Sequence, residues 1–572
     1  MGYGNLRQWI EQLRKDKDLA VIDTPVDPYL ELAEIHRRVI QNEGPALLFT
    51  QVKGTPFPVV TNLFGTVRRV NQAFGPHPEQ LMKSLINAFG NVHPPTISSL
   101  WKEKKMLLDL MKVGTKNVSQ GEAPVLGTCQ NKDSLKDLPR ITSWQGESEP
   151  FIEFPLVYTE SLDNSKDHNL GMYRVRIQDD NTTNIIWHSQ MNGGFHHHEA
   201  KLRGEALPVS IFIGGPPALI AAASAAVPER IPELLFASMM LRGRLPMVKD
   251  PMGGHRIPAE AEFAIRGLVP PNEQDFSVMH VQRIWHRKDA IYPATIVGKP
   301  RQEDYYLADF LQRLLSPAYP VVMPSVHSIW TYTESGSQSL ASAVVHESYS
   351  SEALESAFRI LGEGQRSRIH FLFLTNEPVE LSNFPRLLET VLERFNPASD
   401  LLIFNKNTPN ELEYDGKTNT GSKGIMMGIG KPIRELPLSY DEGVIPGIYD
   451  VQPYCRGCLT VSGASYEEEP TLPQRLVSSL RQQESSWPLV ILVDHAAKAV
   501  QTQASFIWNV FTHFNPAADM YAESKVDHHH IGYKLPIVID ARKKPGNPEE
   551  LFTSEDTIEL VNRNWNNYFP TA

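Results

Sequence analysis

Apolar and polar residues repeat along this chain with two different periods. Near the N-terminus, apolar residues three and four positions apart predict amphipathic helices over Leu6–Leu13 and Tyr29–Gln41. Between them, the continuous apolar run Leu19–Ile22 predicts a strand. Because helix and strand alternate here, we expect an α/β domain over residues 1–120.

The middle of the chain, residues 121–303, is rich in short strand-like runs. They are Tyr173–Ile177, Asn184–Trp187, Val209–Ile213, Val278–Trp285 and Ala294–Val297. So many short strands predict a barrel or sandwich that is interrupted by helices. The long apolar stretch Val209–Val227 is broken at Gly214–Pro217, so we interpret it as a buried strand, a turn and a helix from Ala218, and expect no membrane span.

The C-terminal region contains an internal repeat. A helical pattern over Asp304–Leu315 begins a connecting segment, residues 304–365, and an α/β region follows over residues 366–572. Within it, Phe395–Asp400 recurs as Phe514–Asp519, at an offset of 519 − 400 = 119 residues. The neighbouring segments correspond in the same way: strand-like Ile369–Leu374 falls near Leu489–Val493, and helix-like Phe384–Phe395 on Gln503–Phe514. We therefore predict a duplicated strand-helix-strand unit that serves packing and contact between subunits.

The composition is that of a globular protein. Hydrophobic residues make up 41% and charged residues 21% of the chain, which excludes a disordered class. The net charge of -11 argues against nucleic acid as the main partner. Three cysteines are too few to staple 572 residues, and the N-terminus lacks a basic-then-apolar signal pattern, so we expect a cytoplasmic protein.

Candidate chemistry is concentrated in three segments of the middle region. They are Asn169–Arg174, Trp187–Gln190 and Pro228–Leu234. Together they offer an amide oxygen, a carboxylate and a guanidinium around a glycine. These groups suit a site that holds a divalent cation and an anionic phosphate together.

At these segments the chain resembles the UbiD family, decarboxylases that use prenylated flavin mononucleotide (FMN). Further matching segments run nearly from end to end: Asn5–Arg7, Val26–Pro28, Phe57–Gly65, His286–Asp289, Val297–Pro300 and Gly421–Lys423. The resemblance implies an α/β (α+β) fold with an N-terminal α/β domain, a central split β-barrel that binds the flavin, and a C-terminal α/β oligomerisation domain. A fold hosts many functions, so the reaction must be argued from the site.

The resemblance implies a divalent metal, Mn²⁺ (or Mg²⁺), with K⁺ nearby, that holds the flavin phosphate. Asn169 and Glu233 match the family's asparagine and glutamate ligands, whereas Gln190 stands where the family has histidine. A glutamine oxygen is neutral and favours hard cations. Further ligands could come from His188 or from His196–His198, which follow a predicted bend at Gly193–Gly194. We favour the alternative that these histidines form a surface cluster.

The resemblance also implies contacts to the flavin and the substrate. The expected cofactor-binding residues are Gly171, Met172, Tyr173, Arg174, Trp187, Gln190, Ser224 and Lys423. Arg174 matches an arginine that meets the substrate carboxylate or the reacting face of the flavin, and a guanidinium binds carboxylates bidentately. A structural ion pair with a nearby acid is the alternative role for Arg174.

The proton donor is the largest departure from the family pattern. The family's Glu-Gly-Pro-Phe-Gly-Asp/Glu loop is absent, because Pro271 is followed by only Asn272–Ser277 before the next strand. We expect Glu273, Asp275 or Glu262 to replace it, although each could instead be solvated or structural. Arg266 also stands where the family has a glutamate.

Three functions follow from the resemblance. The first is reversible carboxylation or decarboxylation of an aromatic ring, with CO₂ as partner and with a covalent adduct between ring and prenylated flavin, which a flavin prenyltransferase supplies. The second is a non-catalytic scaffold subunit of a hetero-oligomeric arene or phenylphosphate carboxylase. The third is binding of ordinary FMN without carboxylation. Retention of Asn169, Arg174 and Glu233 favours the first, as a homo-oligomer (dimer or hexamer) or within a hetero-oligomer.

Overall fold

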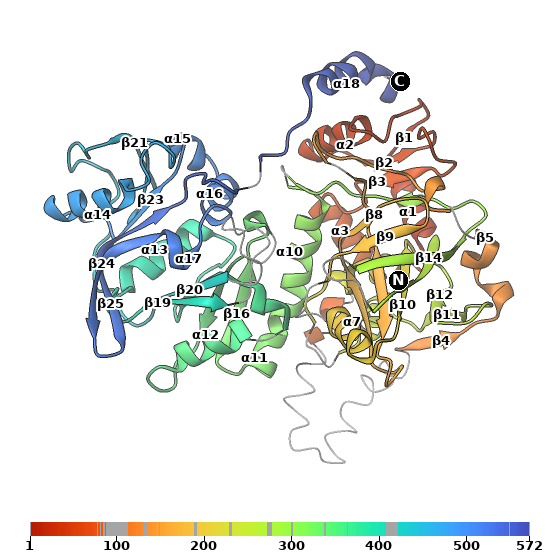
Figure 1. Cartoon of the computed structure of the whole chain (residues 1–572), viewed down its shortest axis with the longest axis horizontal. Coiled ribbons are helices and arrows are strands. Elements are labelled where there is room, and N and C mark those ends of the chain that lie inside the picture. Colours follow the sequence, from red (N-terminus) through yellow and green to blue (C-terminus); the bar gives the residue numbers. More distant parts are fainter. Residues whose placement is uncertain are drawn as a thin grey trace. The chain divides into compact units, whose positions relative to one another are not determined.

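The computed structural model divides the chain into two compact units (Figure 1). Unit 1 comprises Met1–Leu315 and Glu550–Ala572, and unit 2 comprises Ser316–Glu549. The structure describes residues 2–76, 78–80, 82–83, 86, 113–130, 134–147, 149–187, 192–227, 231–271, 277–298, 301–336, 339–362, 364–407, 421–547 and 549–570. No helix in these ranges is both long and apolar enough to cross a membrane.

The N-terminal part of unit 1 is a small α/β layer. Its elements are α1 (Leu6–Lys15), β1 (Leu19–Ile22), α2 (Glu31–Gln41), β2 (Ala46–Phe49), β3 (Val59–Thr61), α3 (Val67–Phe74) and β15 (Tyr292–Pro293). The sheet order is β1-β2-β3-β15. Asn5 caps α1 by accepting a hydrogen bond from the backbone of Gln8 (3.0 Å), which satisfies one free N–H group of the first turn. The predicted helices and the predicted strand of this region are confirmed.

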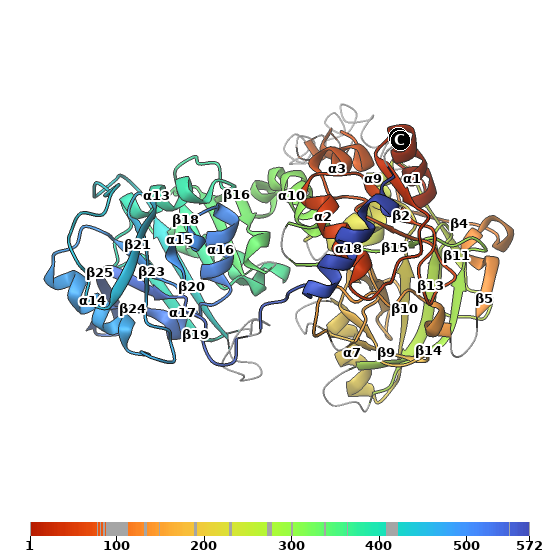
Figure 2. The ribbon, with the colours of Figure 1, turned by 90° about the horizontal axis from the view of Figure 1, so that it is seen from above.

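A helix from the end of the chain completes this layer. Helix α18 (Glu555–Tyr568) packs along α2 (Figure 2). Val561 is fully buried there, and Arg38 donates to Asn562 Oδ1 (2.6 Å). Unit 1 therefore needs both ends of the chain.

The centre of unit 1 is a curled antiparallel sheet. Its strands are β5 (Thr128–Gln130), β6 (Leu156–Glu160), β7 (His168–Met172), β8 (Val175–Ile177), β9 (Thr182–Ile185), β10 (Leu207–Ile213), β13 (Phe263–Val269) and β14 (Ser277–His286). Their order is β7-β6-β10-β13-β14-β9-β8, with β5 on β14. Strands β7 and β8 are at opposite ends of this order, yet only Tyr173 and Arg174 join them. Since two residues span only about 10 Å, the sheet must curl until its two edges meet, and Tyr173–Arg174 mark the seam of a split barrel.

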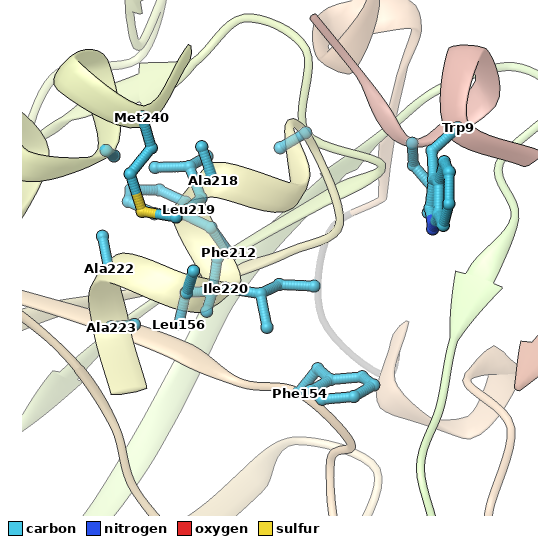
Figure 3. Packing of buried hydrophobic residues seen from close by; sticks show 14 of the residues in the cluster. Trp9, Phe154, Leu156, Phe212, Ala218, Leu219, Ile220, Ala222, Ala223 and Met240 are labelled. Carbon is cyan, nitrogen blue, oxygen red and sulfur yellow. The ribbon is translucent and has the colours of Figure 1, made fainter. Parts of the chain in front are cut away.

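The two faces of this sheet pack into two different cores. Val157, Ile211 and Ile265 alternate with Leu156, Phe212 and Ala264 along their strands and enter separate clusters, as the two-residue period of a strand requires. The second set packs against α8 (Pro217–Ser224) and α9 (Glu233–Leu241). Figure 3 shows Leu156 and Phe212 beside Leu219 and Ile220 of α8, with Met240 of α9 close by. Helix α8 is apolar on all sides because the sheet and α9 enclose it.

The other helices and strands of unit 1 lie outside the curled sheet. They are α7 (Asn192–Arg203), α10 (Glu303–Leu315), and a small sheet of β4 (Thr115–Asn117), β11 (Leu245–Lys249) and β12 (Arg256–Pro258). Two sequence predictions are wrong here. Gly193 and Gly194 lie inside α7 and form no bend, and Ala294–Val297 is not a strand, since β15 ends at Pro293. The barrel itself, and helices from about Ala218 and over Asp304–Leu315, are confirmed.

Unit 2 contains two five-stranded sheets. The first has β16 (Val326–Thr331), β17 (Leu340–Val345), β18 (Phe371–Thr375), β19 (Leu401–Asn407) and β20 (Gly421–Gly428), with α11 (Tyr319–Val322), α12 (Glu352–Gly362) and α13 (Phe384–Arg394). The second has β21 (Ile448–Cys455), β22 (Cys458–Gly463), β23 (Leu489–Leu492), β24 (Met520–Asp527) and β25 (His530–Asp540), with α14 (Leu472–Gln482), α15 (Ala496–Ala499), α16 (Gln503–Phe511) and α17 (Pro516–Asp519).

The two sheets have the same topology, which confirms the predicted duplication. Their orders are β16-β17-β18-β20-β19 and β21-β22-β23-β25-β24. In both, the successive pairings are antiparallel, parallel, parallel and antiparallel. We call residues 326–428 the first copy and residues 448–540 the second copy. Strands β16 and β17 precede residue 366 but belong to the first copy, whereas the domain boundaries given above stay predictions.

Candidate functional site at the barrel seam

The seam holds the amide of Asn169 in one orientation. Asn169 is buried on β7, and its Nδ2 donates to the hydroxyl of Tyr173 (3.1 Å). The backbone N–H of Gly193 donates to the same hydroxyl. The bond to Tyr173 uses the side-chain nitrogen of Asn169. The side-chain carbonyl oxygen of Asn169 is therefore the atom that can accept from a ligand or coordinate a cation.

Glu233 reaches the same strand from a helix terminus. It is the first residue of α9, and its Oε2 accepts a hydrogen bond from the backbone N–H of Leu170 (3.3 Å), at the free edge of β7. Burial raises the pKa of the Glu233 carboxyl, while hydrogen bonds from its own N–H and that of Leu170 oppose the rise. A bound cation would relieve this burial cost.

Of the three predicted metal ligands, Glu233 contacts Leu170, the residue next to Asn169, and the binding of a cation by this pair stays a prediction. The third, Gln190, lies outside the described residues, as does His188. An amide oxygen and a carboxylate suit a hard divalent cation. Within the described part of the chain, no group of three or more His, Cys, Asp or Glu side chains is arranged to hold a metal ion.

Several predicted cofactor-binding residues line the same seam. The Oγ of Ser224 lies 3.9 Å from the sulfur of Met172. The rings of Tyr173 and Trp187 meet edge to face at 5.1 Å, and His197 stacks on the other side of Trp187 at 5.7 Å. The indole N–H of Trp187 is buried, and no described residue accepts its hydrogen bond. A polar ligand at the seam could satisfy this donor.

Two glycines make room for Tyr173. A Cβ on Gly171 would lie 2.7 Å from Cε2 of Tyr173, and a Cβ on Gly193 would lie 2.5 Å from its hydroxyl oxygen. Gly171 was expected from the sequence to contact the cofactor, whereas the role of Gly193 was not predicted. The Gly193–Gly194 pair in the sequence was the signal that could have indicated this role. We interpreted it as a bend, whereas the structure shows that a glycine is needed at position 193 because α7 approaches Tyr173 closely.

Arg174 is exposed beside these residues. Its backbone carbonyl accepts from Ile186 (3.1 Å), which ties the seam to the strand pair β8–β9, and no described residue pairs with its guanidinium. A carboxylate could therefore bind this guanidinium, and the contact of Arg174 with the substrate stays a prediction.

The predicted acids lie elsewhere or are not described. Glu262 is fully buried and paired with Arg7 (3.1 Å) and Arg287 (3.4 Å), and it accepts from the backbone of Ile291 (3.0 Å). Burial raises its pKa although the two arginines oppose the rise. Among the described residues it makes no hydrogen bond or ion pair with the seam. Glu273 and Asp275 lie outside the described residues.

Lys423 belongs to unit 2. It is buried in β20, where its ammonium donates to the carbonyls of Ile369 (2.7 Å) and Ser367. Ser367 lies in the 3-10 helix Gly364–Arg368 and Ile369 in the short connection from it to β18 of the same sheet. Its predicted contact with the flavin stays a prediction.

The described histidines of α7 differ in burial. His196 was expected on the surface, but it is buried and its Nδ1 lies 2.8 Å from the hydroxyl of Thr159. Burial lowers the pKa of His196, and lowers that of His197 to about 4. Both rings are therefore neutral at pH 7 and serve as hydrogen-bonding and stacking groups. His198 is exposed.

Arg266, which replaces a family glutamate, has its own acid. Its Nη1 donates to Asp250 (2.8 Å), and Arg283, its cross-strand neighbour on β14, lies 3.5 Å from the same carboxylate. This pairing accounts for a buried arginine at this position, because an unpaired charge would be costly.

Comparison with known proteins identifies the family of this chain. Three models of the UbiD family match: the 3-octaprenyl-4-hydroxybenzoate carboxy-lyase N-terminal domain over residues 10–89, the Rift-related domain over residues 116–300 and the C-terminal domain over residues 305–428. An uncharacterised protein of Chlamydia trachomatis is 42% identical over 99% of this chain and 100% of its own length. A Chlamydia pneumoniae protein, named as one subunit of a 4-hydroxybenzoate decarboxylase, is also 42% identical, over 99% of this chain and 98% of its own length.

Solved structures show the same fold at low sequence identity. Vanillic acid decarboxylase of Sedimentibacter hydroxybenzoicus, in its closed form, superimposes with a TM-score of 0.64 and 20% identity, over 78% of this chain and 96% of its own. The UbiD-class enzyme HmfF of Pelotomaculum thermopropionicum, solved in complex with prenylated FMN, gives a TM-score of 0.58 and 22% identity, over 78% and 98%. The chain described here belongs to the UbiD family.

Proposed function

We propose that this chain catalyses the reversible carboxylation or decarboxylation of an aromatic ring with bound prenylated FMN. The observation that carries the proposal is the hydrogen bond between the Glu233 carboxylate and the backbone of Leu170, the residue next to Asn169 on β7, directly before the seam at Tyr173–Arg174. The HmfF neighbour is described as binding prenylated FMN, and the vanillic acid neighbour as a decarboxylase, which supports the proposal without fixing the substrate.

Each group at the seam has a distinct task. The Asn169 carbonyl and the Glu233 carboxylate, with Gln190, hold Mn²⁺ or Mg²⁺, and this cation with a neighbouring K⁺ neutralises the flavin phosphate. The walls of the cofactor site are formed by Met172, Tyr173, Trp187 and Ser224. Prenylated FMN, when bound, supplies the electron sink for loss or uptake of CO₂.

Arg174 orients the substrate by binding its carboxylate through two parallel hydrogen bonds. The ring carbon that exchanges CO₂ must also gain or lose a proton. We assign this proton to Glu273 or Asp275 on the shortened loop, since Glu262 is held by Arg7 and Arg287. Glu273→Gln and Asp275→Asn variants that both keep the wild-type rate of hydrogen-deuterium exchange at this carbon would exclude the loop.

A second candidate function is that of a non-catalytic subunit in a hetero-oligomeric carboxylase. Two observations favour it: the family's acidic loop is missing from the sequence, and the Chlamydia pneumoniae relative is named as one subunit of a decarboxylase.

One experiment separates these functions. The chain is coexpressed with a flavin prenyltransferase, the released cofactor is identified by absorbance and mass, and the loaded protein is tested for exchange of labelled CO₂ into aromatic acids. We expect prenylated FMN and exchange. Prenylated FMN without exchange for any aromatic acid tested supports the scaffold function, and ordinary FMN alone contradicts the catalytic function.

A further inference from the structure

The two copies in unit 2 share one apolar core. The cluster contains Phe371, Phe373 and Phe384 of the first copy and Phe506 and Phe511 of the second. Rings from the two copies meet directly: Phe384 and Phe511 have centroids 5.8 Å apart. The two copies are therefore not independent domains, because each copy covers aromatic surface of the other that would otherwise be exposed to water.

The contacts between the copies are reciprocal. Asn515–Ala517 of the second copy lies on β20 of the first, where the backbone N–H of Ala517 donates to Ser422 Oγ (3.1 Å). The corresponding motif of the first copy, Asn396–Ala398, lies on β25 of the second, where the carbonyl of Pro397 accepts from the backbone N–H of Tyr533 (3.1 Å). Since β20 and β25 occupy the same place in their sheets, the same motif contacts the same strand in both directions.

One contact lies on the axis that relates the copies. The backbone N–H of Phe384 donates to Gln503 Oε1 (2.9 Å), and these two residues are 119 positions apart. That separation equals the offset of the repeated motif, and each residue is the first of its helix, α13 or α16. In a two-fold arrangement, only residues at the axis meet their own counterparts.

We propose that the second copy is a built-in partner that occupies the self-complementary face of the first copy. A face with reciprocal contacts of this kind can pair with an identical domain. Here the paired domain is the second copy, residues 448–540 of the same chain, which has the same strand order and lies beyond residue 428, at which the family's C-terminal model ends. The face defined by α13, β20 and Asn396–Ala398 is thus closed to a second chain. Any assembly of this protein uses other surfaces.

The linker gives the internal pairing its advantage. Residues 429–447 join β20 to β21. A linker this short holds its two ends at an effective concentration of the order of 1 mM. At ~10 µM protein, pairing within the chain should therefore exceed pairing between chains by about 100-fold.

A disulfide at the interface can distinguish the two pairings. A Cβ on Gly532 would lie 3.4 Å from Cα of Ala398, so cysteines at these two positions stand on adjacent backbone segments. The full chain carrying Ala398→Cys and Gly532→Cys is oxidised, in a background where the exposed Cys129 is changed to Ser. In a second sample, the two substitutions are divided between two chains with different tags, and equal amounts are mixed. Each single variant, oxidised alone, is the control.

We expect the double variant to form its disulfide within one chain of 64.4 kDa, shown by the linked peptide pair and by unchanged mass on a non-reducing gel. The mixed sample should show at most about 1% cross-linked chains. A cross-link between the two tagged chains would overturn the proposal, because the face would then be open to a second molecule. Failure of the double variant to form the disulfide would overturn it as well, because the copies would not be packed in this way. Neither result depends on cofactor or activity.

Discussion

Tyr173 is the residue that orders the candidate site. Its ring is buried, its hydroxyl accepts from Asn169 and from the backbone of Gly193, and burial raises its pKa to about 12. It therefore stays protonated at any working pH and can hold the Asn169 amide in one orientation. In metal sites, such hydrogen bonds to a ligand are worth roughly 10- to 100-fold in metal affinity.

We expect Gly171→Ala to displace this tyrosine. The new Cβ would lie 2.7 Å from the ring, and overpacking of this kind costs about 1–3 kcal/mol, more than the roughly 0.5–1 kcal/mol that alanine gains over glycine in a strand. Thermal unfolding should show lower stability, and Mn²⁺ titration followed by electron paramagnetic resonance should show weaker binding. Gly121→Ala is the matched control, because its Cβ would meet open space. If both variants behave like the wild type, the position of the Tyr173 ring does not depend on a glycine at position 171.

Arg174→Lys tests the proposed substrate contact. Lysine keeps the charge but loses the bidentate fork, so we expect turnover to fall by about 10²- to 10³-fold while the cofactor content stays nearly constant. Arg176→Lys, two residues along on β8 and paired with Glu149 (3.4 Å), is the control and should keep its turnover. If Arg174→Lys is as active as the control, Arg174 does not bind the substrate carboxylate.

At this scale the sequence predicts residues better than it predicts their surroundings. The motif was enough to single out Asn169 and Glu233, which the structure brings to one strand. The hydrogen bond from Gly193 to Tyr173 links positions 20 residues apart in sequence through the docking of α7, and no local pattern encodes it. For the same reason His196, in a run of three histidines, was expected on the surface although it is buried.

At the scale of elements, the free edge of β7 is the decisive feature. A strand edge exposes unpaired N–H groups, and Glu233 at the start of α9 accepts from one of them. The helix N-terminus favours the ionised carboxylate by roughly 0.3–1 kcal/mol, whereas burial disfavours it. The raised pKa indicates that burial wins when no cation is present.

This balance predicts how Glu233 makes the stability of the metal-free protein depend on pH. Because its pKa is higher in the folded than in the unfolded state, the folded protein binds more protons above the ordinary glutamate pKa, and stability falls as pH rises through that window. Glu233→Gln removes this cost and can still accept from Leu170. With chelator present, the variant should therefore gain stability relative to wild type as pH rises.

With Mn²⁺ bound, the wild type should become more stable than the Glu233→Gln variant. At about 100 times its Kd, a ligand stabilises the folded state by roughly 2.7 kcal/mol, and only the wild type should show this gain. Thermal unfolding against pH, with chelator or with Mn²⁺, measures both effects, and Glu435→Gln at an exposed site is the control. A metal-free wild type that gains on the variant as pH rises would contradict the burial argument.

Periodicity predicted most of these elements, but it could not predict how they connect. Short strand-like runs marked β10 and β14, whose buried residues enter the apolar clusters of unit 1. The closure of the barrel depends on β7 and β8 being both edges and neighbours in sequence, which is a property of strand order. In the run Ala294–Val297, Ala294 and Ile296 are buried although β15 has already ended at Pro293, so the pattern resembled a strand.

At the scale of the whole molecule, the chain leaves unit 1 after Leu315 and returns at Glu550. The repeat could be predicted because the copies share a motif, whereas the return could not, because the amphipathic pattern of α18 does not specify which surface it covers. Its partner is α2, where Val561 and Tyr568 enter the core of unit 1. The stability of unit 1 therefore depends on residues that follow the whole of unit 2 in sequence.

Calorimetry of two matched variants tests this division. Val561→Ala empties a fully buried site in α18, and Val490→Ala does the same in β23 of the second copy. Each should cost about 1–3 kcal/mol and lower one melting transition by about 2–6 °C. Because α18 belongs to unit 1, Val561→Ala should shift only the transition that bound Mn²⁺ also shifts, and Val490→Ala only the other. Glu559→Ala, on the exposed face of α18, should shift neither. If both valine variants lower the same transition by similar amounts, the two units unfold as one and the C-terminal helix does not belong to unit 1 alone.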